Sequence, residues 1–205
     1  MLSLRNQSLL PPHATAERSF QMESNSSNIL MTNPLMNSHS PYFFDSCSPS
    51  SIKVCKDQDI AKMNKYDFRS KCVGVVFQNF NLLSKLTAVE NVVLSMEISG
   101  MKEKDKKQKA YELLEKVGLD KDEADRRILK LSGGQQQRVA IARALSYDPD
   151  IILADEPTGN LDGETQNEIM DIFKSLAEAG KCVIIVTHSP EVAEMADLVY
   201  EIKKK

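Results

Sequence analysis

The sequence predicts an α/β fold with a mostly parallel sheet and a mainly helical insertion between roughly residues 80 and 132. Three observations predict it. Apolar runs of strand length alternate along the chain with longer segments whose apolar residues recur every three or four positions. The runs are apolar throughout, which is typical of strands covered by helices on both faces of a sheet. The length of 205 residues suits one compact domain.

Composition and charge argue against several classes of protein. The chain is 41% hydrophobic and 27% charged, as in ordinary globular domains, and its net charge is only −3. We therefore expect no nucleic-acid partner, since no polybasic arm stands out. No apolar run approaches the roughly 18 to 20 residues that cross a bilayer. The four cysteines include no Cys-x-x-Cys pair, so we expect reduced thiols and a cytoplasmic protein.

The composition changes near residue 48. Residues 1–50 hold five of the eight prolines, many Ser and Asn residues and no glycine, and their apolar residues follow neither a helical nor a strand period. We expect residues 1–48 to be an atypical, disordered segment. Residues 49–205 then form the globular domain.

The first half of this domain contains two predicted strands and two predicted helices. Residues 51–55 and 71–77 have the apolar and β-branched character of strands. A helix begins at Thr87, because Thr87 and Glu90 form a capping box ahead of a one-sided apolar face. A second helix is predicted over residues 104–117, in front of a glycine that ends it.

The second half continues the alternation of strands and helices. Helices are predicted over residues 135–145 and 164–179, each with its apolar residues on one side. Strands are predicted over residues 150–154, 182–187 and 198–202.

A segment suited to binding anions is Ser132-Gly133-Gly134-Gln135, at the predicted start of a helix. A hydroxyl and two glycines expose several backbone amides at the positive end of the helix dipole, and no Cβ blocks the approach of phosphate oxygens. The alternative is that Ser132 is an ordinary N-cap followed by a glycine-rich turn.

Charged and ionisable residues follow two of the predicted strands. Asp155 and Glu156 come directly after one strand, at the carboxyl edge where open α/β folds bind ligands. One carboxylate can hold Mg²⁺ while the next orients an attacking water. The alternative is an acidic turn closed by Pro157, which is common, and an Asp-Glu pair by itself is a weak signal. His188 follows the next strand and can donate a hydrogen bond to a γ-phosphate, but a lone histidine there is usually a loop residue.

Taken together, these segments resemble the nucleotide-binding subunit of ATP-binding cassette (ABC) transporters over about residues 50–205. Five motifs stand in the family's order: the Q-loop glutamine Gln78, the signature motif at 131–135, the Walker B strand at 151–156, the D-loop at 159–162 and the switch histidine His188. Residues 77–83, 87–92 and 154–162 are similar to the lipoprotein-releasing, macrolide-exporting and antimicrobial-peptide-exporting ATPases.

The resemblance implies a P-loop NTPase-like fold, with ATP and Mg²⁺ as cofactors. It implies hydrolysis of ATP to ADP and phosphate, coupled to transport through a separate permease. Glu156 would polarise the attacking water and His188 would contact the γ-phosphate, while Asp155 and Gln78 would organise Mg²⁺. Asp162 would link the two sites of a dimer.

The same resemblance implies the partners and the location of the chain. In this family two ATP-binding subunits meet head to tail, so Ser132, Gly133, Gly134 and Gln135 would face the ATP held by a second ATP-binding subunit, in a homodimer or heterodimer. The other partner would be a transmembrane permease, which chooses the cargo. The chain would be cytoplasmic and peripheral on the inner face of the cell membrane.

One motif of the family has no counterpart in this sequence. The Walker A loop, Gly-x-x-x-x-Gly-Lys-Ser/Thr, precedes the Q-loop and wraps the phosphates, but the first glycine here is Gly74 and the Gly-Lys pair is Gly180-Lys181. We expect the family's N-terminal strands and Walker A helix to be missing or replaced, which makes self-sufficient ATPase activity doubtful. Two alternatives are a catalytically silent donor of the signature motif in a heterodimer and a truncated, non-functional cassette.

Overall fold

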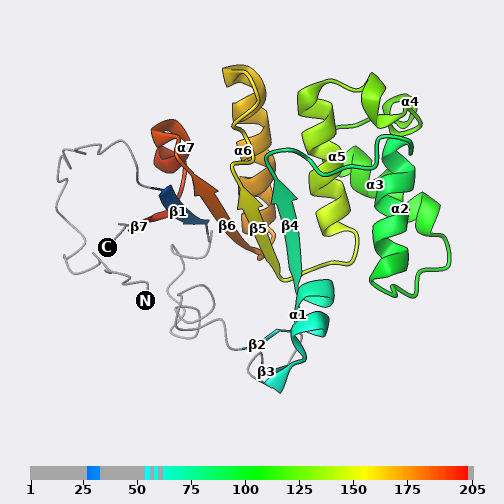
Figure 1. The fold of residues 1–205 in the computed structure, drawn as a ribbon, viewed down its shortest axis with the longest axis horizontal. Coiled ribbons are helices and arrows are strands. Elements are labelled where there is room, and N and C mark those ends of the chain that lie inside the picture. The colour runs from blue at the N-terminus through cyan, green and yellow to red at the C-terminus, as the bar shows by residue number, and fades with distance from the viewer. Residues whose placement is uncertain (1–26, 33–53, 56–57, 60–61, 203–205) are drawn as a thin grey trace.

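The computed structural model describes residues 27–32, 54–55, 58–59 and 62–202. They form a five-stranded sheet, helices packed on it and a helical part at one side (Figure 1). The predicted α/β fold is confirmed.

The sheet has the strand order β4-β5-β6-β1-β7. Its strands are β4 (Val73–Phe77), β5 (Ile151–Asp155), β6 (Cys182–Thr187), β1 (Ser27–Thr32) and β7 (Leu198–Ile202). Strands β4, β5 and β6 are parallel, with Phe77 opposite Asp155 and Asp155 opposite Val186. The two pairs that involve β1 are antiparallel. The parallel half of the sheet therefore carries the predicted motifs.

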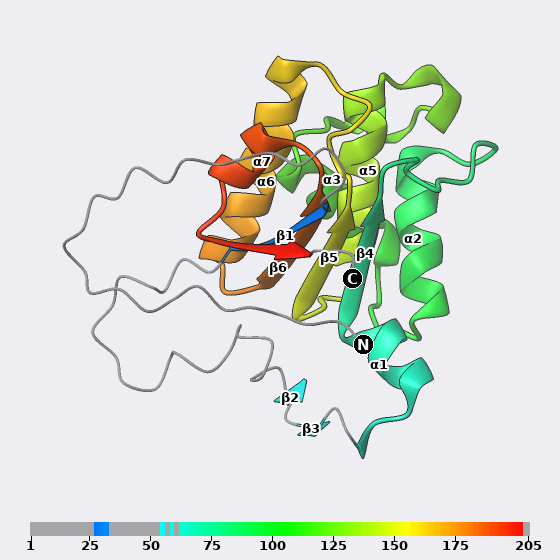
Figure 2. The same ribbon diagram turned by 60° about the vertical axis from the view of Figure 1, so that its left-hand side comes forward.

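Strand β1 was not predicted, because it lies within the segment 1–48 that we expected to be disordered. It fits between β6 and β7, where Ile29 is opposite Val186 on one side and Tyr200 on the other. Figure 2 shows β1 alongside these two strands. The rest of segment 1–48 lies outside the described residues. The predicted strand 51–55 is described only over β2 (Val54–Cys55), which pairs with β3 (Gln58–Asp59).

The four helices predicted from the sequence lie close to their expected positions, as α2 (Ala88–Ile98), α3 (Lys106–Lys116), α5 (Gly133–Leu145) and α6 (Gly163–Glu178). The described residues also form shorter helical elements that were not predicted, namely α1 (Lys65–Lys71), α4 (Lys121–Ala124), the 3-10 turn η3 (Ile128–Lys130) and α7 (Pro190–Glu194). The predicted capping box is present at α2, since Thr87 Oγ1 accepts from Glu90 N and Thr87 N donates to Glu90 Oε2. The helical part predicted for about residues 80–132 holds α2, α3, α4 and η3.

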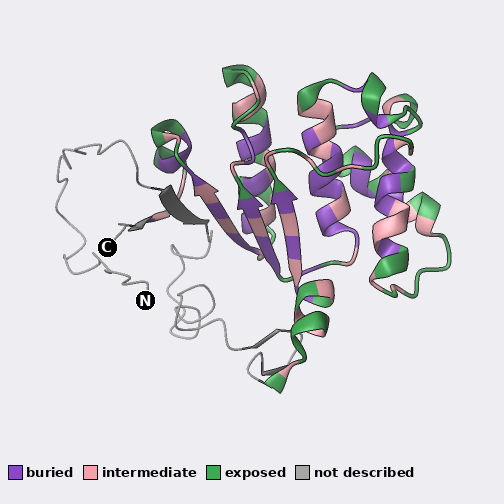
Figure 3. Cartoon of the chain, viewed as in Figure 1, coloured by how far each residue is buried: buried purple, intermediate pink, exposed green. Residues whose placement is uncertain are grey.

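One face of the sheet is well covered. Helices α5 and α6 pack against it (Figure 1), and Val76, Ile152 and Ile185 on this face are fully buried. Side chains at alternate positions, such as Val75 and Ile184, are only half-buried (Figure 3). The expectation of a sheet covered on both faces is therefore wrong for the described residues: successive side chains point to opposite faces, and these helices cover one.

Two further expectations concern membranes and thiols. Within the described residues, no helix is long and apolar enough to cross a membrane. Cys72 is disulfide-bonded, whereas Cys182 is a buried thiol outside any disulfide. The expectation of reduced cysteines is therefore wrong for Cys72. Sequence spacing could not show this, because a disulfide requires two Cα atoms within roughly 7 Å of each other, and the tertiary structure sets that distance.

Candidate functional site

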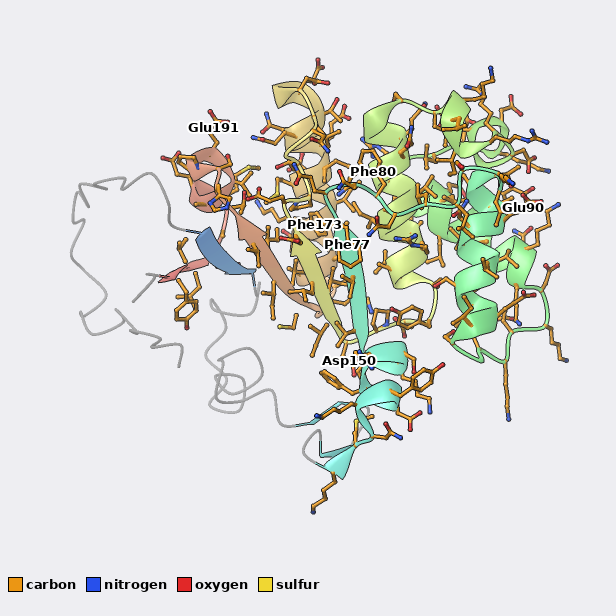
Figure 4. All side chains as sticks on the ribbon, viewed as in Figure 1. Phe77, Phe80, Glu90, Asp150, Phe173 and Glu191 are labelled. Atoms are coloured by element: carbon orange, nitrogen blue, oxygen red, sulfur yellow. The ribbon has the colours of Figure 1, made fainter. Side chains whose placement is uncertain are left out.

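The carboxyl ends of three parallel strands bring the predicted residues to one edge of the sheet. Gln78 follows β4, Glu156 follows β5 and His188 follows β6. Because Phe77 is opposite Asp155 in the register, the residues that follow them are neighbours in space. Figure 4 shows Phe77 at this end of β4. The structure thus brings Gln78, Asp155, Glu156 and His188 together, at the edge where α/β folds bind ligands.

Both carboxylate oxygens of Glu156 accept hydrogen bonds. Oε2 accepts from the hydroxyl of Thr187 at 2.9 Å, and Oε1 accepts from the backbone amide of His188 at 2.7 Å. The backbone amide of Glu156 donates to Val186 O at 2.8 Å. Glu156 has a φ of +44°, in the left-handed region that a residue with a Cβ adopts when its surroundings hold it there. The end of β6 therefore fixes the carboxylate predicted to activate water.

The imidazole of His188 lies beside this carboxylate and faces solvent. Its Nε2 is 3.9 Å from Glu156 Oε1, and 64% of the side chain is exposed. An exposed imidazole at this place can meet a phosphate oxygen. The geometry is compatible with the role expected for His188, which stays a prediction.

Gln78 is tied to the segment that follows Glu156. Its Nε2 donates to Asn160 Oδ1 at 3.4 Å, and Asn160 Nδ2 donates to Gln78 O at 3.3 Å. A Cβ on Gly159 would lie 2.8 Å from Gln78 Nε2, so glycine permits this close approach. Asn160 was not predicted as a site residue. It lies within the 159–162 motif, but its type and spacing did not indicate which residue it meets.

Ser132 is the N-cap of α5, as the simpler interpretation predicted. Its Oγ accepts from Gln135 N at 3.2 Å and its amide donates to Gln135 Oε1 at 2.8 Å, which completes a capping box. The cap leaves the amides of Gly133 and Gly134 without acceptors inside the helix. Ser132 and Gly133 are exposed. The two interpretations are therefore compatible: the cap fixes the helix start, and the helix start presents amides to an anion.

The start of α5 lies against the start of α6. A Cβ on Gly134 would be 2.5 Å from Thr165 Cγ2, and a Cβ on Gly133 would be 3.6 Å from Leu161 Cδ2. Asp162 caps α6 by accepting from Thr165 N at 2.9 Å and from Thr165 Oγ1 at 3.0 Å. These hydrogen bonds lower the pKa of Asp162 below its ordinary value. The signature motif and the D-loop thus share one packed corner.

The described residues include no group of three or more His, Cys, Asp or Glu side chains that could hold a metal ion. Mg²⁺ commonly takes one or two carboxylates and completes its shell with water and phosphate oxygens. The exposed carboxylate of Asp155 fits that smaller role. The amide nitrogen of Gln78 bonds Asn160, so its amide oxygen is the group able to face a metal. These residues fit a magnesium nucleotide but not a metal ion alone.

Comparison with known proteins shows what this chain is similar to. A family model described as "ABC transporter" matches residues 43–159. The uncharacterized ABC transporter ATP-binding protein YclH of Bacillus subtilis (strain 168) is 49% identical over 140 residues, which are 68% of this chain and 62% of that protein. The macrolide export ATP-binding/permease protein MacB of Aggregatibacter actinomycetemcomitans is 44% identical over 161 residues, 78% of this chain and 25% of that protein.

A solved structure agrees in fold and sequence. It is the dimeric post-hydrolysis state of the ATP-binding cassette MJ0796 bound to ADP and Pi, with a TM-score of 0.59 and 41% identity over 69% of this chain and 64% of that one. The chain spans about three fifths of the length of relatives such as YclH, 62% in that case.

Proposed function

Because the chain belongs to the ABC transporter ATP-binding family, we propose that it is the ATP-binding subunit of a transporter that couples ATP hydrolysis to export through a separate permease. The observation that carries the proposal is the exposed N-terminus of α5, where Ser132 caps the helix and the amides of Gly133 and Gly134 have no acceptor within it. Glu156 and His188, together at the edge of the sheet, support it.

The residues of this chain would act on bound nucleotide in distinct ways. MgATP supplies the phosphoanhydride bond whose hydrolysis drives transport. The hydroxyl of Ser132 and the amides after it offer donors to phosphate oxygens at the positive end of a 13-residue helix. The carboxylate of Asp155 would coordinate the metal ion, and the carboxylate of Glu156 would accept a proton from the attacking water molecule. Thr187 keeps the Glu156 carboxylate at the sheet edge.

We propose a second ATP-binding subunit as partner, which makes the chain half of a dimer. The similar cassette MJ0796 is dimeric in its solved structure. A second candidate function is that of a catalytically silent donor, in which Ser132 and its glycines act on ATP that the other subunit holds. The complete α5 N-terminus favours it, together with a sequence that contains no Gly-x-x-x-x-Gly-Lys-Ser/Thr segment.

We propose that the permease docks in a groove next to the Gln78 loop, with the chain peripheral on the cytoplasmic face of the membrane. A cavity of about 290 Å³ opens between α1, α2 and α5, and Leu83, Ile98 and Arg143 line part of it. Leu83 is 52% exposed and Ile98 is 68% exposed, which is high for large apolar residues. Because Leu83, five residues after Gln78, lines the groove, a protein bound there is well placed to act on that glutamine.

The experiment that tests the proposal is a complementation assay. The partner is a full-length cassette of the family that carries the Walker A loop but has its own signature serine replaced by arginine. The assay measures MgATP hydrolysis by this chain alone, by the partner alone and by the mixture. Hydrolysis by this chain alone supports the self-sufficient subunit, and hydrolysis by the mixture alone supports the signature donor. No hydrolysis in any of them contradicts both candidates.

The matched variants are Ser132→Arg and Ser175→Arg. Both place an arginine at an exposed serine, but Ser175 lies in α6, away from the α5 N-terminus. We expect Ser132→Arg to abolish the activity of the mixture and Ser175→Arg to preserve it. Equal activity of the two variants would show that the α5 N-terminus does not meet the nucleotide.

A further inference from the structure

Two consecutive residues shortly after Gln78 have positive φ angles without being glycines. Phe80 has a φ of +59° and Asn81 a φ of +51°. Asparagine tolerates the left-handed region, but for a bulky residue such as Phe80 this region is unfavourable and persists where the surroundings impose it. The conformation of this loop therefore depends on contacts made from elsewhere in the fold.

Arg143, in the last turn of α5, makes those contacts. Its Nη2 donates to Phe80 O at 2.9 Å and its Nη1 donates to Asn81 O. A planar guanidinium that reaches two consecutive carbonyls fixes the peptide between them. Burial lowers the pKa of Arg143, and the neighbouring Tyr147 acts in the opposite direction. The guanidinium is partly buried, and the two loop carbonyls accept hydrogen bonds from it. Phe80, labelled in Figure 4, lies between the end of β4 and α5.

The loop is anchored at its two ends as well. At one end Gln78 and Asn160 exchange hydrogen bonds. At the other end the buried Asn91 accepts from Leu83 N at 2.8 Å and donates to Leu83 O at 3.2 Å. Arg143 holds the stretch in between, and it also lines the groove beside Leu83. One side chain of α5 thus touches both the Gln78 loop and the surface open to a partner.

We propose that Arg143 is a positioning residue for Gln78. By holding the carbonyls of Phe80 and Asn81, it sets the path of residues 79–82 and so keeps the Gln78 side chain within reach of Asn160. Ser132 caps the other end of the helix that carries Arg143, so α5 contacts the Gln78 loop at its last turn and carries the signature motif at its first. The inference rests on the proposed function for the role of Gln78, but its test requires no nucleotide.

The test compares four full-length proteins: wild type, Arg143→Lys, Arg143→Ala and Arg138→Ala. Arg138 is the matched control, because it is another arginine of α5 that donates to a backbone carbonyl, Val117 O at 2.6 Å, and it pairs with Glu168 at 2.7 Å. Amide hydrogen exchange is measured over residues 80–86 and over α6. The side-chain amide resonances of Gln78 are followed by NMR.

We expect Arg143→Ala to speed exchange over residues 80–86 roughly tenfold, with no change in α6, because the loss of both hydrogen bonds frees the loop locally. Lysine keeps the charge without the planar fork, so Arg143→Lys should give a smaller increase in the same residues. Both variants should shift the Gln78 resonances. Arg138→Ala should change neither the exchange of residues 80–86 nor the Gln78 resonances, although it removes an ion pair to Glu168 of α6.

Two results would overturn the inference: Gln78 resonances unchanged in both Arg143 variants, or exchange that rises equally in the loop and in α6. If Arg143→Ala does not fold, Arg143→Lys decides by the same criteria. The outcome is separable from the proposed function. A released loop together with a failed complementation assay rejects the ATPase role alone, and an unchanged loop with successful complementation rejects the positioning role alone.

Discussion

The hydroxyl of Thr187 donates a hydrogen bond at 2.9 Å to the carboxylate of Glu156, which joins the end of β6 to the residue after β5. Thr187 is fully buried, and its hydroxyl also accepts from Ser189 N at 3.1 Å. Because the two residues are 31 positions apart, the orientation of the predicted catalytic carboxylate depends on the strand register.

This bond should contribute measurably to stability. Thr187→Val preserves the shape of the side chain and removes the donor, so the free energy of unfolding in urea should fall by about 1.5 to 3 kcal/mol, as for other hydrogen bonds to charged groups. Thr165→Val is the control. It removes a hydroxyl that bonds the exposed Asp162 and should have a smaller effect. A larger loss in Thr165→Val than in Thr187→Val would contradict the prediction.

The two glycines of the signature motif should respond differently to alanine. At Gly134 the new Cβ would be 2.5 Å from Thr165 Cγ2, and Thr165 is itself held by two bonds to Asp162. We expect Gly134→Ala to lower the free energy of unfolding, measured in urea, by about 1 to 3 kcal/mol. At Gly133 the nearest atom is 3.6 Å away, an ordinary contact. Gly133→Ala should therefore be neutral or stabilising by up to about 1 kcal/mol. The reverse order of the two variants would show that the corner is packed differently.

The N-cap of α6 should make stability depend on pH. Hydrogen bonds from the amide of Thr165, and then from its hydroxyl, lower the pKa of Asp162 below its ordinary value of 3.8. Because the folded pKa lies below the unfolded one, the ionised carboxylate stabilises the fold above pH 3.8 and loses this contribution as the pH falls through the folded pKa. Asp162→Asn keeps a capping oxygen without the charge. It should lower Tm at neutral pH and match the wild type in strong acid.

Circular dichroism melts over this pH range provide the measurement. Asp171→Asn, an exposed carboxylate further along α6, is the control and should not show the same convergence. A Tm difference for Asp162→Asn that stays constant down to strong acid would rule out this role of the cap.

Gln137 should tolerate methionine better than glutamate. Its side chain is fully buried in α5, and Nε2 donates to Pro157 O at 2.7 Å, while Oε1 has no hydrogen-bond partner among the described residues. Gln137→Glu places an oxygen against that carbonyl oxygen and buries a charge. The free energy of unfolding measured in urea should therefore fall by at least about 3 kcal/mol. Gln137→Met removes the donor to Pro157 O, but it also removes Oε1, the buried oxygen that has no hydrogen-bond partner among the described residues. We expect it within about 1 kcal/mol of wild type. Equal stability of the two variants would contradict this account.

Much of the fold followed from patterns carried by neighbours in the chain. The predicted strand 182–187 has the bounds of β6, and the predicted helix 164–179 differs from α6 by one residue at each end. The Thr87 capping box was readable because both of its members lie within one turn. Glu156 and His188 could be placed at one sheet edge because each follows a strand and the two strands are parallel.

Other features needed the folded chain. The place of β1 between β6 and β7, the bond between Gln78 and Asn160, and the disulfide of Cys72 were not foreseen. The amino-acid order was sufficient wherever a helix cap or an apolar period links residues a few positions apart. Contacts across the fold, such as Arg143 on a loop 62 and 63 residues earlier, leave no periodic trace in the sequence, so the three-dimensional packing alone decides them.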